Sequence, residues 1–270
     1  MDDKISSLPT KIVEDLYKVG FPSEVAAASS LEREKWMVYN GVLFLDPETK
    51  KPREIDIHAV KVDWSLADQA PEKKSGNENK LISHLVIEVK KSSRPWVFFD
   101  NGSVAWPQIP PQNFKSEIEG FDELTFDDLK GLGMKTHRHI DSKLHKSFHV
   151  SFSDPSQPSA IYESLIKTTI ALNYFKNRYG VGGYALHLFI PIVIFDGTLW
   201  SASLDIKKGV TLKKVDSLLT VFSRLVEDNN GGSYEEEQIC EVVTLDSFTK
   251  YLGIIDHDNT EVYKAWTNFF

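Results

Sequence analysis

The chain has 270 residues, of which 41% are hydrophobic and 26% charged, and this composition is typical of a globular protein with a sizeable core. Its net charge of −8 argues against broad, unaided binding of DNA, because such binding comes largely from neutralising phosphates. The single cysteine excludes an internal disulfide, the N-terminus lacks the apolar segment of a secretory signal, and no apolar run is long enough to span a bilayer. We therefore expect a cytoplasmic protein without a membrane segment.

The first third of the chain predicts two helices followed by three strands. Residues 1–35 favour helix with a break at Gly20, and Ser23 is placed to cap the second helix, which runs from Glu24 to about residue 34. Aromatic and branched residues predict strands at 36–45, 53–64 and 81–90.

The rest of the chain predicts a mixture of strands and long helices. In chain order, these elements are a short strand at 96–99, a helix from about 161 to 180, a core strand at 185–195, a hairpin turn at Asp196-Gly197 into a strand at 198–204, a helix at 211–227, a short strand at 239–244 and one or two terminal helices. This order indicates a single α/β domain, 1–270, with a mixed sheet flanked by helices. The segment of about 100–158 is expected to be an insertion.

One of four Glu-x-Lys tripeptides lies in a context that suggests chemistry. Three of the four lie in polar stretches, whereas Glu88-Val89-Lys90 ends an apolar strand. The two-residue period of a strand puts Glu88 and Lys90 on the same face, and charges there are costly unless they are paired or bound to a metal. An ordinary ion pair at the strand end is the alternative.

Asp56 supplies a second carboxylate, because it is a charged residue within the apolar pattern of the preceding strand. If these two strands pair antiparallel, Asp56 and Glu88 converge. Together with the backbone carbonyl of Val89 they would form an all-oxygen site suited to Mg²⁺ or Mn²⁺. Lys90 would hold the attacking hydroxide or neutralise the transition state.

Two helical residues are weaker candidates for the same site. Glu24 shares a helix face with Ala28 and Leu31, so it is expected to point inward and to bind the metal or its water. A carboxylate that only interacts favourably with the helix dipole is the alternative for Glu24. Lys167 on the long helix is more typical of a solvent-facing lysine, although it could also face the site.

These residues together resemble the PD-(D/E)XK nuclease superfamily. The resemblance is carried by Glu24 in an early helix, by Arg53-Glu54-Ile55-Asp56 in one strand, and by Ile87-Glu88-Val89-Lys90 in the next. It covers residues 10–100 well and 160–200 loosely, and the proline of the family motif is replaced by Ile55.

The resemblance implies a restriction-endonuclease-like αβββαβ core with its active site at one edge of the sheet. By that resemblance Asp56, Glu88 and Lys90, with Glu24, would be catalytic. The protein would require Mg²⁺ or Mn²⁺ and would cut DNA in restriction, antiviral defence or repair. Cutting both strands needs two sites, so a homo-oligomer is plausible. RNA as the substrate stays open.

Two other functions fit the same fold. One is a regulated effector subunit that is silent until a partner protein of a larger defence complex releases it. The other is a non-catalytic scaffold or binding module. The set Asp56, Glu88 and Lys90 argues against the second, because a scaffold has no use for charges at a strand end.

A locally basic segment at 130–149 is the candidate DNA-binding surface, with Lys135, Arg138, Lys143 and Lys146 as phosphate contacts. The histidines of this segment suggest zinc as an alternative, but they lack cysteines or a fixed ligand frame. A solvated loop is the third interpretation.

Overall fold

The structure is a computed structural model, and it describes residues 7–18, 20–63, 80–104, 114–116, 143–153, 159–179, 185–205, 207–227 and 232–269. The elements in chain order are α1 (Leu8–Lys18), α2 (Phe21–Arg33), β1 (Met37–Leu45), β2 (Pro52–Asp63), β3 (Lys80–Lys91), β4 (Trp96–Val104), β5 (Phe114–Ser116), β6 (Lys143–Val150), α4 (Ala160–Arg178), β7 (Ala185–Asp196), β8 (Leu199–Asp205), β9 (Gly209–Lys214), β10 (Ser217–Glu227), β11 (Ser233–Thr244), a 3₁₀ turn (Leu245–Ser247) and α5 (Phe248–Phe269).

The described strands form one mixed sheet of 11 strands, in the order β1-β2-β3-β7-β11-β10-β6-β4-β8-β9, with β5 paired to β7. Strands β1, β2 and β3 are an antiparallel meander, and β7 lies parallel to β3. Parallel neighbours need a crossover connection, and α4 lies in the one between β3 and β7. The predicted α/β class with a mixed sheet is therefore confirmed.

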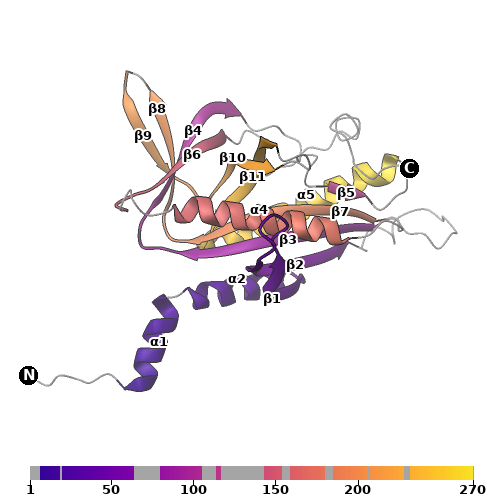
Figure 1. Ribbon diagram of the computed structural model, residues 1–270, viewed down its shortest axis with the longest axis horizontal. Coiled ribbons are helices and arrows are strands. Elements are labelled where there is room, and N and C mark those ends of the chain that lie inside the picture. The colour runs from indigo at the N-terminus through magenta and orange to yellow at the C-terminus, as the bar shows by residue number, and fades with distance from the viewer. Residues whose placement is uncertain are drawn as a thin grey trace, which may run out of the picture.

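Helices cover both faces of the central strands (Figure 1). Helices α2 and α5 pack on the face that carries Leu85 and Ile87 of β3, whereas α4 packs on the face that carries Val86. Since successive side chains of a strand point to opposite faces, these contacts place α4 opposite α2 and α5. Strand β7, enclosed on both faces, is buried along its length except at Asp196.

Helix α1 extends away from the rest of the molecule (Figure 1). None of its residues is buried, and its apolar residues Leu8, Ile12 and Leu16 are exposed. Neither α1 nor any other helix in the described part of the chain is long and apolar enough to cross a membrane.

The helix predicted at 211–227 is wrong, because this segment forms β9 and β10. Strand β10 lies inside the sheet between β11 and β6, and both Leu218 and Leu219 are buried although they point to opposite faces. A strand buried on both faces loses its polar–apolar alternation. The spacing of its apolar residues then resembles that of a helix.

The hairpin predicted at Asp196-Gly197 is also wrong, because β8 pairs with β4 and β9 and not with β7. The turn is tied instead to the loop before β4, where the amide of Ser92 donates to the carbonyl of Asp196. A side chain at Gly197 would meet this loop, since an added Cβ would lie 2.6 Å from the carbonyl oxygen of Ser92. The close approach explains the glycine at this position.

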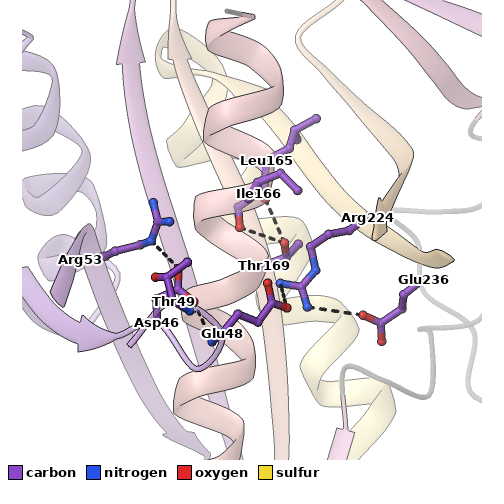
Figure 2. A network of polar contacts seen from close by, with 9 residues as sticks. All are labelled: Asp46, Glu48, Thr49, Arg53, Leu165, Ile166, Thr169, Arg224 and Glu236. Atoms are coloured by element: carbon purple, nitrogen blue, oxygen red, sulfur yellow. Dashed lines mark hydrogen bonds and ion pairs between the residues drawn. The ribbon is translucent and has the colours of Figure 1, made fainter. Parts of the chain in front are cut away.

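A polar network joins the β1–β2 turn to β10 (Figure 2). The guanidinium of Arg224, in a side chain that is 8% exposed, lies 3.2 Å from Glu48 and 3.7 Å from Glu236. Asp46, buried at the start of the turn, accepts hydrogen bonds from two turn amides and from Arg53. Burial acts to raise the pKa of Asp46, but these hydrogen bonds outweigh it and lower the pKa to about 2. The β1–β2 turn is therefore stabilised by its own hydrogen bonds and by the ion pair of Glu48 with Arg224 of β10.

Candidate active site

Two carboxylates meet where the ladder between β2 and β3 ends. The strands pair antiparallel, as predicted, and their register ends at Ile57 and Ile87. One residue further along each strand lie Asp56 and Glu88. The carboxylate oxygen Oδ2 of Asp56 accepts a hydrogen bond of 2.7 Å from the amide of Val89. The side chain of Asp56 thus takes the place of the backbone carbonyl that would otherwise continue the ladder between the two strands. The contact fixes the aspartate against the end of β3.

Glu88 is fully buried, at 0% exposure, because it lies within the continuous buried run of the central strand β3. Burial raises the pKa of Glu88, the charge of Asp56 raises it further, and the ammonium groups of Lys90 and Lys167 oppose both effects. The Nζ of Lys90 lies 2.6 Å from Oε1 of Glu88, and the Nζ of Lys167 lies 2.6 Å from Oε2. Each oxygen of the carboxylate thus faces one cation.

Lys167 connects the two carboxylates, since its Nζ also lies 3.3 Å from Oδ1 of Asp56. Burial acts to lower the pKa of Lys167, but the charges and hydrogen bonds of Glu88 and Asp56 outweigh it and raise the pKa. The sequence did signal this position, because Lys167 precedes the buried residues Ile170 and Ala171 by three and four positions and therefore shares their helix face. A lysine on the core face of a helix requires a partner. The identity of that partner was not readable from the helix alone.

Glu24 lies at the margin of this cluster. Its neighbour Ser23, which was expected to cap α2, instead donates a hydrogen bond of 2.5 Å to Asp196, and the N-cap is Gly20. This contact anchors the first turn of α2 to the end of β7. Burial raises the pKa of Glu24, and the charge of Asp56 adds to this effect. The glutamate is half-buried and responds to the charges of the cluster.

The cluster fits a divalent cation in its donor chemistry but not in its present arrangement. Asp56 and Glu88 offer the hard oxygen ligands that Mg²⁺ and Mn²⁺ prefer, and both already lie within 3.3 Å of one positive charge, that of Lys167. In the described part of the chain, however, no three residues of the types His, Cys, Asp and Glu are grouped so that they could hold a metal. The backbone carbonyl of Val89 as a third ligand stays a prediction.

The candidate DNA-binding lysines that the structure describes are both paired with acids. The Nζ of Lys143 lies 2.8 Å from Asp100, and the Nζ of Lys146 lies 2.8 Å from Glu237. Their charges are thus partly neutralised within the protein. Lys135 and Arg138 lie outside the described residues.

One histidine of the same segment has a structural role. His145 is buried in β6, and its ring lies within hydrogen-bonding distance of the carbonyl oxygen of Leu219 and the hydroxyl of Ser201. Burial lowers the pKa of His145. These contacts account for His145 without a zinc ion.

Comparison with known proteins found no match: no family model matches the sequence, and no curated protein or solved structure matches it.

Proposed function

We propose that this chain is a metal-dependent endonuclease of the PD-(D/E)XK type that hydrolyses the phosphodiester bonds of DNA. The observation that carries the proposal is the meeting of Asp56 and Glu88 at the end of the β2–β3 ladder, with Lys90 beside them. The fully buried carboxylate of Glu88 carries a desolvation cost that a purely structural role does not explain.

The order of the central elements supports the proposal. Helix α2, the meander β1-β2-β3, helix α4 and the parallel strand β7 occur in the αβββαβ order, with β4, β5 and β6 inserted between β3 and α4 and with the helices on opposite faces. The strands from β11 to β9 extend the sheet beyond such a core. By this proposal they are additions to the core, and they offer surface for binding substrate.

By this proposal, the residues of the cluster have different roles in hydrolysis. Asp56, Glu88 and the carbonyl of Val89 would hold the divalent cation, which supplies charge stabilisation at the phosphate and lowers the pKa of a bound water. Lys90, whose side chain is 38% exposed and whose Nζ contacts Glu88, can reach a phosphate oxygen or the attacking water. Glu24 adds negative charge that favours a cation at this place.

The test is cleavage of plasmid DNA in Mg²⁺ or Mn²⁺ by wild type and three variants. Asp56→Asn and Lys90→Ala are each expected to slow cleavage by at least about 100-fold, the usual effect of removing a group that stabilises transition-state charge. Lys91→Ala is the matched control, because Lys91 is the next residue of β3, is equally exposed and pairs with Asp196. Absence of cutting by wild type, or equal cutting by all four proteins, would contradict the proposal.

A non-cutting protein is the second candidate, and the ion pairs of the site favour it. Both oxygens of Glu88 face ammonium groups, so this carboxylate is ion-paired without any metal. A scaffold, or an effector that is silent until a partner opens the site, would have this arrangement. Saturable Mn²⁺ binding that Asp56→Asn abolishes would exclude the scaffold, and cutting that begins only after a partner is added would identify the effector.

A further inference from the structure

Lys167 is the residue that makes the Asp56–Glu88 pair tolerable inside the protein. Two carboxylates that face the same point repel each other, and the cost rises when one of them is fully buried. Among the residues that the structure describes, the Nζ of Lys90 forms an ion pair with Glu88 alone, through Oε1. The ammonium of Lys167 lies 2.6 Å from Oε2 of Glu88 and 3.3 Å from Oδ1 of Asp56, so it is the cation that the two acids share.

The position of this ammonium is also the position that both carboxylates would offer to a metal. A divalent cation held by Asp56 and Glu88 would need the oxygens that now face Lys167, and it would repel the ammonium strongly at that distance. The two cations therefore exclude each other. We propose that Lys167 is an internal counter-cation of the Asp56–Glu88 pair and that a divalent cation displaces it on binding.

The surroundings allow the side chain of Lys167 to leave while α4 stays in place. The helix is anchored by Ile170, Ala171 and Phe175, which are buried on the same face of the sheet. The side chain of Lys167 is 26% exposed, so part of it already reaches solvent. Because lysine has a long flexible stem, its ammonium can swing outward by rotation about side-chain bonds.

This inference deepens the proposed function and rests on it in one respect, the binding of a divalent cation at Asp56 and Glu88. It adds that, in the metal-free protein, the ammonium of Lys167 occupies the position that the metal would take. Metal binding then has to work against an existing ion pair, so the chain is expected to bind the metal more weakly than its carboxylates alone would.

The test is calorimetric titration of Mn²⁺ into wild type, Lys167→Met, Lys167→Arg and Lys176→Met at pH 8. Lys167→Met removes the competing charge and is expected to bind Mn²⁺ at least about 10-fold more tightly than wild type, a difference of about 1.4 kcal/mol in binding free energy. Lys167→Arg keeps the charge and is expected to bind no more tightly than wild type. Lys176→Met, a change on the same helix at a residue outside the cluster, is the control and should bind like wild type.

Thermal unfolding gives a second readout that does not depend on cleavage. Without metal, Lys167→Met should unfold at a lower temperature than wild type, because Glu88 and Asp56 lose their shared cation. Saturating Mn²⁺ should remove most of that difference. If Lys167→Met folds only in the presence of Mn²⁺, the inference is supported, and if Mn²⁺ stabilises both proteins equally, it is overturned.

The possible failures are distinguishable. Equal or weaker Mn²⁺ binding by Lys167→Met, with clear binding by wild type, would overturn the displacement of Lys167 and leave the metal site standing. Binding by neither protein would overturn the metal site, and the proposed function with it.

Discussion

The buried carboxylate of Glu88 depends on its two lysine partners, and this dependence is measurable as stability. Glu88→Gln removes the negative charge and leaves the ammonium groups of Lys90 and Lys167 close to each other. Breaking a buried ion pair costs about 3–5 kcal/mol, and we expect about 2 kcal/mol here because both lysines are partly exposed to water. Chemical denaturation of the metal-free protein measures this value.

The control for that measurement is an ion pair at the surface. Glu237→Gln breaks the pair with Lys146, in which both side chains are about half exposed, and should cost less than about 1 kcal/mol. Equal losses for Glu88→Gln and Glu237→Gln would show that the buried cluster contributes no more than a surface pair.

At this scale the sequence indicated the strand residues of the site more clearly than Lys167, whose partners it did not reveal. Asp56, Glu88 and Lys90 could be recognised because each is a charge within an apolar strand, where a charge needs an explanation. The ion pair between Lys167 and Asp56 could not be predicted, because the two residues lie 111 positions apart in the chain. They meet only because α4 packs across β2 and β3. Ser23 shows the same limit, because its distant partner Asp196 replaces the local cap.

Three neighbouring strands and α4 together bury a row of histidines, which makes stability depend on pH. His58 of β2, His84 of β3 and His187 of β7 are buried, with ring nitrogens 3.3 Å apart between the first two and 2.9 Å apart between the second two. Burial lowers the pKa of His58 to about 4 and that of His84 to about 2. The neighbouring histidines lower the pKa of His84 further.

We expect the free energy of unfolding to fall as the pH drops below 6.5. In the unfolded chain these histidines bind protons with the ordinary pKa of 6.5, whereas the folded protein binds them only near pH 4 for His58 and pH 2 for His84. The unfolded state therefore takes up more protons in this range, and His58 and His84 are each expected to cost about 2 kcal/mol at pH 5. Denaturation at pH 7, 6 and 5 checks this prediction.

A matched pair of variants assigns the pH effect to the row. His84→Phe replaces a ring that stacks on Phe189 with another aromatic ring, and should make the loss of stability between pH 7 and 5 smaller. The exposed His149 gives the control, His149→Gln, which should leave the slope unchanged. The row would have no part in the pH dependence if His84→Phe kept the full slope.

Elements were predictable where one face is buried and the other exposed, or where turn-forming residues mark the end of the helix or strand. Strands β1, β2, β3 and β7 and helix α4 agree with their predicted ranges, and β7, which is buried on both faces, was recognisable because Asp196-Gly197 marks its end. Strand β10 was mistaken for a helix because neighbouring strands and helices bury both of its faces, and that burial is a property of the sheet rather than of the segment.

At the scale of the whole molecule, the sheet decides which residues can meet. Its central part, from β1 to β7, brings the site residues together, and α4 crosses this part with Lys167 on its inner face. The width of the sheet beyond β7 was not predictable, since strand order depends on contacts between segments far apart in the chain. The Glu48–Arg224 pair illustrates this, because it joins the turn of the first hairpin to β10 (Figure 2).

We propose that Asp56 and Glu88 share one cation, which is Lys167 in the metal-free protein and a divalent metal in the active protein. A crystal structure of the protein soaked in Mn²⁺, with anomalous diffraction data, tests this claim most directly. We predict an anomalous peak between the two carboxylates, at about 2.0–2.2 Å from their oxygens, with the ammonium of Lys167 displaced. Continued contact of Lys167 with both acids at saturating Mn²⁺, without a peak between them, would contradict it.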